Sequence, residues 1–434
     1  MSTERRIGLL SATGIGVGSM LGAGVFSDMW VDVLAAGSWA LAAVLAAAAV
    51  ALMNALSTAQ LAARYPVAGG AYAYGRAELG AFAGHVAGAA FVVGKTVSVA
   101  AGATVLGAYV LPGHAQGIAT AAVVAAWALN ARGITRTARG ATVIAVVVVV
   151  ALVAIVALAW AGEPADAGPP VPVLAADAGP AVTFLVAVAA CFFAFAGYAR
   201  IATLGEEVRD PSRTIGRAIL LALAVVVALY LAVAAALVRL GADRLTAAVV
   251  RDGDAIMTTG EVAPIEQLAR VGGVPVWVVT LVASLSVGGA MLAVMAGAGR
   301  TAMAMAREGD LPRALAHTGA SGAPWRAEGV VALAAVALVW TQGASLVLVS
   351  ASSVLLYYAV ANLAAARQRR AGRTVGLAIP AVVSLLGLAC SLVLAAVAIV
   401  GAGEASWPVF AIGGAVIGWP AVALVVRRRP RVTF

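Results

Sequence analysis

Long apolar runs, separated by short polar or Gly/Pro-rich segments, follow one another from Ile7 to Val426. A helix of about 20 apolar residues spans the roughly 30 Å hydrocarbon core of a bilayer. The number of apolar runs between these polar or Gly/Pro-rich segments therefore predicts about twelve membrane-spanning helices. We place them near residues 8–34, 38–63, 79–110, 115–130, 138–161, 180–206, 214–240, 274–305, 328–343, 345–366, 374–401 and 407–426.

The composition supports a membrane protein. The chain has 434 residues, of which 63% are hydrophobic and 11% charged, whereas soluble proteins carry about a quarter charged residues. The first apolar run follows Arg5 and Arg6 and precedes many similar runs, so we expect a spanning helix rather than a cleaved signal peptide. Cys191 and Cys390 both lie within apolar runs, so a disulfide framework is not indicated.

The net charge of +9 comes from basic residues that gather in alternate loops. Acidic residues dominate the remaining loops, which include residues 163–180 and 241–273, the latter with a short amphipathic helix expected around Pro264–Arg270. Because short cytoplasmic loops carry the arginine excess, this alternation favours an even number of spans with both termini in the cytoplasm. We expect one multi-pass domain in the cytoplasmic membrane.

Glycine recurs through Gly14–Phe26 (GIGVGSMLGAGVF), inside the first span. Each glycine weakens a helix by about 1 kcal/mol relative to alanine, and unwound backbone in a membrane survives only where it lines a cavity or is buried in protein. The exposed N–H groups of such a break suit a carboxylate ligand. Close helix packing is the alternative interpretation; the spacing does not fit a dinucleotide-binding fingerprint.

A second break is predicted in the sixth span, where Cys191–Arg200 (CFFAFAGYAR) places Gly197 among aromatic residues. Interrupted helices at the first and sixth positions are typical of two inverted five-helix repeats with a binding site between them. We therefore expect an all-α transporter fold with repeats at 1–161 and 180–370. Two further helices and a basic tail would occupy 371–434.

At this point the chain resembles the amino acid–polyamine–organocation (APC) superfamily of transporters. Besides the two breaks, the similarity rests on Tyr65–Gly80 (YPVAGGAYAYGRAELG), Asn130–Gly133 (NARG), Phe193–Arg217, Arg300–Pro312 (RTAMAMAREGDLP) and Ser352–Arg369. The resemblance implies a permease that moves amino acids by alternating access, as a symporter or antiporter, without a cofactor or metal centre.

The resemblance also implies the substrate contacts. The α-carboxylate is expected at backbone N–H groups of the first break, at Ser19, Met20, Leu21, Gly22, Ala23 and Gly24. The α-amino group is expected at carbonyls of the second break, around Phe193, Ala194, Phe195 and Ala196, with Gly197 as a further substrate contact. Phe195 or Tyr198 would act as a gate over the site; core or lipid packing is the alternative for the phenylalanines.

Lys95, the only lysine, departs from the family pattern. Many members carry a lysine in helix five that stands in for a bound sodium ion, but that place falls near Val148, within a run of valines. Lys95 lies at the centre of the predicted helix 79–110, where a charge costs about 2.5–3.5 kcal/mol on insertion scales. No Asp or Glu occupies the central part of any predicted span. Its partners could be carbonyls of the broken helices, water or a substrate carboxylate, or it could lose its proton.

We hypothesise that Lys95 replaces the helix-five lysine as a fixed or proton-switchable cation beside the site. The alternative is a structural role, in which the lysine is buried against carbonyls or points into a water-filled crevice. Ser284 and Ser286 could complete a sodium-like site with carbonyls of the first helix, although serines in spans often bond their own helix. Glu206, Glu207 and Arg209 could form a cytoplasmic gate, or simply a solvated loop cluster.

A carboxylate-binding break without nearby acidic residues favours a neutral amino acid as the substrate, with the lipid bilayer as the other partner. A polyamine or cationic amino acid antiporter of the same fold is the alternative, and the coupling ion, proton or sodium, stays open. A membrane-embedded enzyme is disfavoured because the sequence has no HExxH or GxSxG motif and no intramembrane aspartate pair. A channel should show a charged ring or filter, and none is recognisable. Nothing indicates a nucleic acid partner, and the oligomeric state stays open.

Overall fold

The computed structural model describes residues 7–67, 69–133, 138–162, 179–205, 207–240, 249–252, 255–258, 264–319, 321–341 and 345–427. These residues are mostly α-helical. The helices are α1 (Leu9–Met20), α2 (Met29–Ala36), α3 (Ala40–Arg64), α4 (Ala71–Leu79), α5 (Ala81–Val110), α6 (Ala115–Ala131), α7 (Ala138–Ala161), α8 (Pro180–Phe195), α9 (Ala199–Ala202), α10 (Pro211–Arg239), α12 (Pro264–Val271), α13 (Val276–Arg307), α14 (Trp325–Val339), α15 (Leu346–Arg370), α16 (Ala381–Gly401) and α17 (Trp407–Arg427).

Nine helical segments of the described part are long and apolar enough to cross a membrane. They begin with Leu9–Ser27 and end with Ala381–Gly401. Three of the predicted spans fall short of that length: α6 has 17 residues, α14 has 15, and the apolar part of α17 is Trp407–Gly418. The chain is therefore a multi-pass membrane protein, while the count of twelve spans and the inverted repeat stay predictions.

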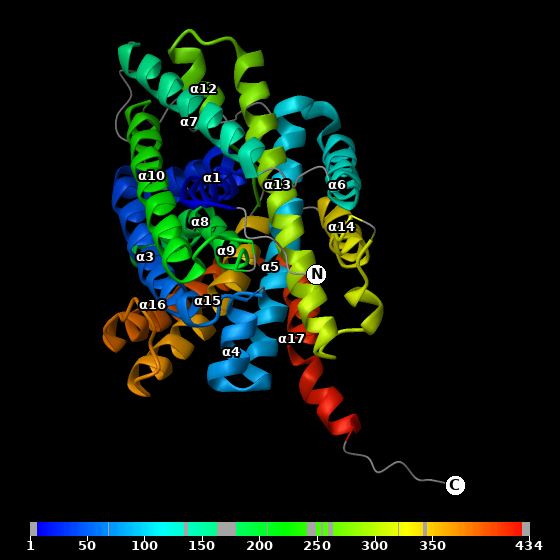
Figure 1. Cartoon of the computed structure of the whole chain (residues 1–434). Helices are drawn as coiled ribbons and strands as arrows, with labels where there is room; N and C mark the ends of the chain where they lie inside the picture. The colour runs from blue at the N-terminus through cyan, green and yellow to red at the C-terminus, as the bar shows by residue number, and fades with distance from the viewer. Residues whose placement is uncertain are drawn as a thin grey trace.

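The two interrupted helices lie at the centre of the molecule. Figure 1 shows α1 and α8 surrounded by α3, α5, α10 and α13, while α6 and α14 lie to one side. The difference in burial follows this arrangement: in an apolar 18-residue stretch of Pro180–Ala202, 72% of the residues are buried, against 28% in a similar stretch of Gly140–Ala161. Val143, Val146 and Val150 of α7 are exposed, as expected for side chains that face lipid.

The loops differ from the sequence-based expectation in two places. The span predicted at 79–110 is preceded by a separate helix, α4, because Gly80 has a φ of +109°, which breaks the helical path before α5 begins at Ala81. The loop after α10 contains a two-stranded antiparallel hairpin, β1 (Val249–Asp252) and β2 (Ala255–Thr258). The amphipathic helix expected around Pro264–Arg270 is α12.

The Tyr65–Gly80 motif contacts the loop that follows α13. Arg76 of α4 pairs with Asp310 at 2.9 Å, and the Tyr72 hydroxyl donates to the same carboxylate at 2.8 Å. Burial, together with the Asp310 carboxylate, raises the pKa of Tyr72 above its usual value. The tyrosine therefore stays protonated and keeps donating this hydrogen bond at any physiological pH.

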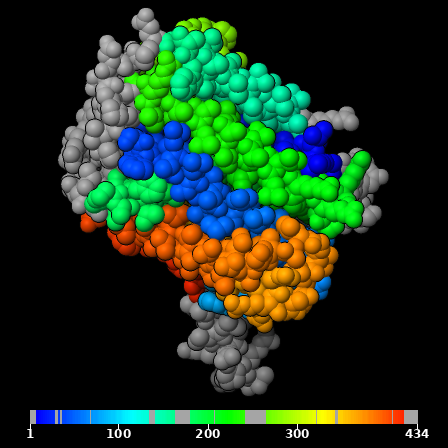
Figure 2. Space-filling view, turned by 90° about the vertical axis from the view of Figure 1, so that its left-hand side faces the viewer, coloured from blue at the N-terminus to red at the C-terminus, as the bar shows by residue number. Residues whose placement is uncertain are grey.

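Polar side chains join α3 to α15 and α16 inside the apolar region. The Asn54 Oδ1 atom accepts hydrogen bonds from Asn362 at 2.6 Å and from Ser391 at 3.2 Å. One turn of helix away, Ser57 donates to Ser384 at 3.0 Å. In Figure 2 the surface of α3 lies between α10 and α16, consistent with these contacts. This network fixes α16 against the core.

We expect Asn54→Leu to destabilise the protein by about 1–2 kcal/mol, because the buried donors of Asn362 and Ser391 lose their acceptor. Thermal unfolding in detergent should show a lowered midpoint. Leu52→Ala is the matched control on the same helix, because Leu52 is exposed and shares none of these bonds. Equal midpoints for Asn54→Leu and wild type would contradict the prediction.

Candidate functional site

The first helix is interrupted within the glycine-rich stretch. α1 ends at Met20, the backbone bends at Leu21 and Gly22, and a π-helical turn covers Gly24–Asp28 before α2 begins. The bend leaves the N–H groups of the following turn without carbonyl partners one turn earlier in the same helix. The sequence-predicted carboxylate contacts, Ser19 to Gly24, all lie at this interruption.

The sixth predicted span is interrupted by a tighter turn. α8 ends at Phe195, a 3₁₀ turn covers Ala196–Tyr198, and the short α9 continues to Ala202. The change from α-helical to 3₁₀ geometry releases carbonyl groups at the end of α8. The predicted substrate contacts of this break, Phe193 to Gly197, lie in the last turn of α8 and in this 3₁₀ turn.

The two interruptions meet at Gly197. A Cβ atom at this position would lie 2.3 Å from the carbonyl oxygen of Ser19 and 2.6 Å from the nitrogen of Met20. Only glycine lets the two backbones approach so closely. Other glycines of the first break pack against side chains, as the alternative interpretation expects: a Cβ at Gly14 would meet Thr142, and one at Gly22 would meet Ala290.

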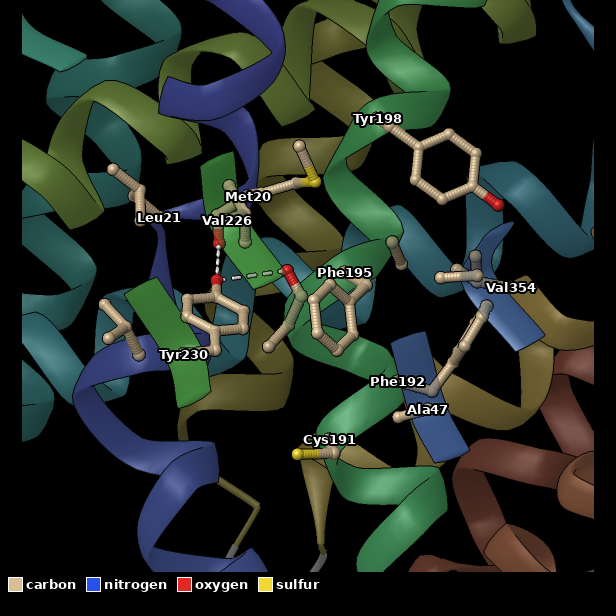
Figure 3. Close-up of a cluster of buried hydrophobic side chains, with 14 of the residues drawn as sticks. Met20, Leu21, Ala47, Cys191, Phe192, Phe195, Tyr198, Val226, Tyr230 and Val354 are labelled. Atoms are coloured by element: carbon tan, nitrogen blue, oxygen red, sulfur yellow. Dashed lines mark hydrogen bonds between the residues drawn. The ribbon is translucent and has the colours of Figure 1, made fainter. Parts of the chain in front are cut away.

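A tyrosine hydroxyl lies within hydrogen-bond distance of backbone carbonyls at both breaks. Tyr230 of α10 donates to the Met20 carbonyl at 2.6 Å and lies 3.3 Å from the Ala194 carbonyl. Figure 3 shows this hydroxyl between the backbone segments of the two breaks, with the Tyr230 ring beside that of Phe195. Sequence reasoning missed Tyr230, because nothing in the α10 sequence distinguishes it from a packed tyrosine.

A cavity of about 40 Å³ lies between the two breaks. Its walls come from α1, α5, α8 and α13. They include Ser19, Met20, Gly22, Ala23, Gly24, Lys95, Ser98, Phe193, Ala194 and Gly197. Most of the predicted substrate contacts are thus brought together around one space, which has room for only a few water molecules in this conformation.

Lys95 of α5 reaches into this cavity. The side chain is 5% exposed, and its Nζ donates to the carbonyl of Ala196 at 3.2 Å. The ammonium also lies 5.9 Å from the centre of the Phe91 ring. Of the partners considered from the sequence, the structure places a carbonyl of the broken sixth span beside Lys95. Among the described residues that line the cavity, Lys95 alone is charged.

The aromatic residues of the second break take different positions. Phe193 lines the cavity. Phe195 is fully buried against Tyr230, with ring centres 5.1 Å apart, and Tyr198 stacks on Tyr358 at 5.1 Å. A gating role for Phe195 or Tyr198 stays a prediction, and would require either ring to leave this packed position.

Of the two serines in α13, Ser286 contacts the first break. Its hydroxyl donates to the carbonyl of Leu21, whereas the Ser284 hydroxyl donates to Thr280 in its own helix at 2.7 Å. A sodium-like site here would draw on the Ser286 hydroxyl and the Leu21 carbonyl, which are oxygen ligands of the kind that hard cations bind. The site stays a prediction.

Two of the predicted gate residues, Glu207 and Arg209, lie in the loop between α9 and α10. Glu207 forms an ion pair with Arg300 of α13. The backbone N–H of Arg209 donates to the Ile7 carbonyl at 2.9 Å, and the N–H of Ile7 to the Glu207 carbonyl at 3.1 Å. The chain segment before α1 is thereby fixed to this loop. Glu206 lies outside the described residues.

A second, larger cavity of about 270 Å³ extends from the first break to loops at Gly133 and Pro324. It shares Ser19 with the central cavity and includes Val148, where many APC members carry a lysine. Among the described residues, four charged side chains line it: Arg200, Glu207, Arg300 and Glu328. Sequence reasoning missed Arg200, Arg300 and Glu328 as site residues, because each lies near the end of a predicted span, where charged residues are common.

Comparisons with known proteins agree with this geometry. The family model described as amino acid permease matches residues 7–422. Proteins called uncharacterized transporters from Mycobacterium bovis and Mycobacterium tuberculosis are 44% identical over 421 residues, which cover 94% of this chain and 91% of the relatives. Both findings indicate a transporter with a small-molecule substrate rather than an enzyme. The chain therefore belongs to the amino acid permease family of the APC superfamily.

Proposed function

We propose that this protein is a secondary active transporter that moves a neutral amino acid across the cytoplasmic membrane by alternating access. The observation that carries the proposal is the crossing of two interrupted helices at Gly197, beside a cavity that contains the Lys95 ammonium. Residues of both breaks line this space, so N–H groups of one break and carbonyls of the other are available to a ligand there. This combination suits the carboxylate and the ammonium of one amino acid.

Lys95 makes a carboxylate the natural partner of the central cavity. A buried ammonium with a neutral carbonyl as its hydrogen-bond acceptor gains a stronger, charge-assisted bond when a carboxylate arrives. The substrate ammonium could then use carbonyls such as that of Ala194. A cationic substrate is disfavoured, because it would bring a second positive charge beside Lys95 in a cavity whose described walls hold no acidic side chain.

The two cavities support alternating access. The volume of the central cavity, about 40 Å³, is far below the roughly 300 Å³ at which small-molecule pockets begin. The volume of the larger cavity, about 270 Å³, approaches that size. A substrate must therefore enter from the larger cavity while the helices at the break separate. Movement of one helix group against the other provides that expansion.

Purified protein in liposomes tests the proposal. Each standard L-amino acid, together with putrescine as a polyamine probe, is offered under a pH gradient, a sodium gradient and with internal substrate for exchange. We expect uptake or exchange of neutral amino acids, and the gradient that drives it identifies the coupling. Liposomes that take up or exchange none of these compounds would refute a transport role for amino acids or amines.

A further inference from the structure

The larger cavity contains two charged groups with unfilled hydrogen-bond positions. Glu328 of α14 is 2% exposed, and its Oε2 atom is buried without a partner, while Asn130 bonds the carboxyl group. Arg200 of α9 donates through Nη1 to Thr203 at 2.6 Å, and its buried Nε has no partner. Both side chains line the same space. A buried polar atom without a partner costs free energy, so each side chain gains a hydrogen bond if it turns toward a ligand in the cavity.

The other two charged side chains of the described cavity wall, Glu207 and Arg300, form an ion pair with each other. Arg200 and Glu328 are close enough to interact electrostatically, yet no ion pair within 4.0 Å joins them among the described residues. The Arg200 guanidinium and the Glu328 carboxylate are therefore farther apart on the cavity wall than a direct ion pair. The four charges of the described cavity wall sum to zero, which suits a ligand without net charge.

Two glycines of α13 make room for this pair of side chains. A Cβ at Gly299 would lie 2.3 Å from Cγ of Glu328, and one at Gly297 would lie 3.5 Å from Cδ of Arg200. Both side chains thus extend over the α13 backbone toward the cavity. Their positions are built by close packing at Gly299 and do not result from loose surface side chains.

We propose that Arg200 and Glu328 form a vestibule site for the zwitterionic backbone of an amino acid, separate from the central cavity. The Arg200 guanidinium binds the α-carboxylate, and the Glu328 carboxylate binds the α-ammonium. A lone anion would face Glu328, and a lone cation would face Arg200, so the zwitterion alone satisfies both. The proposal rests on the proposed function, and it assigns this site as the first contact for substrate that enters from the loops at Gly133 and Pro324.

The test compares transport from the two faces of the membrane. Right-side-out and inside-out membrane vesicles are prepared that contain wild type, Arg200→Gln or Glu328→Gln. Each standard L-amino acid is then added in radiolabelled form in turn. For the amino acids transported, we expect either variant to raise the half-saturation concentration about tenfold from the vestibule face, since one charge-assisted bond is lost. From the opposite face the value should not change.

Arg307→Gln and Glu404→Gln are the matched controls, because both side chains are exposed and lie outside the cavity. Gly299→Ala supplies a second test that keeps every charge: its methyl group displaces Glu328 and should produce the same one-sided effect. Equal shifts from both faces, or a change confined to the maximal rate, would overturn the vestibule site. A wild type inactive from both faces would instead refute the proposed function, and with it this inference.

Discussion

Replacing Gly197 by alanine is expected to reduce transport at least about tenfold. The added methyl group would lie 2.3 Å from the Ser19 carbonyl oxygen, so the two interrupted helices must separate. Overpacking of this kind costs about 1–3 kcal/mol, and it displaces the backbone groups that would bind substrate. Initial rates of uptake in liposomes measure the effect, with protein amount and monodispersity checked by size-exclusion chromatography.

Gly288→Ala is the control, because a Cβ at Gly288 meets no other atom within 4 Å. It is also a glycine within a spanning helix, α13, so general effects of adding a methyl group are shared by both variants. We expect Gly288→Ala to transport at the wild-type rate. If Gly197→Ala also transports at that rate, the crossing of the two breaks is not part of the binding site.

Replacing Lys95 by methionine is expected to lower the uptake of a carboxylate-bearing substrate by about tenfold or more. Methionine keeps a similar length and apolar volume, whereas the charge that faces the central cavity is lost. Loss of one charge-assisted hydrogen bond in a buried site corresponds to at least a tenfold change in affinity. Uptake should be measured over a range of pH in liposomes.

The pH profile decides which role Lys95 plays. If Lys95 is a fixed cation, the methionine variant loses rate equally at every pH; if it exchanges a proton during transport, the shape of the profile also changes. Thr104→Ala is the control on α5, because the Thr104 hydroxyl bonds Ala100 of its own helix at 3.0 Å. An unchanged rate and unchanged pH dependence for Lys95→Met would exclude Lys95 as a fixed cation and as a proton-exchanging group, and would leave only a structural role.

The sequence predicted the membrane class and the positions of the two breaks from local physics. An apolar run long enough to span a bilayer can hardly be anything else, and glycine weakens a helix wherever it occurs. The interruptions after Met20 and Phe195 therefore fall within the stretches identified from the residues alone. Lys95 was also recognisable, because a lone cation at mid-span is costly and needs a partner.

The partners of these residues depended on the tertiary structure. The sequence left four possibilities open for Lys95, and the fold places the Ala196 carbonyl beside it, 101 positions away. Likewise, Glu207 pairs with Arg300 of a distant helix, although sequence proximity had grouped it with Arg209.

Arg200, Glu328 and Tyr230 were missed for the same physical reason. Apolar periodicity and glycine content act over one or two helical turns, so they can be read along the chain. Whether a charged side chain at a span end meets solvent or a cavity depends on which helices pack beside it. The sequence alone thus determined a broken-helix membrane protein, and the packing of α9, α13 and α14 decided that its charges enclose a space suited to a zwitterion.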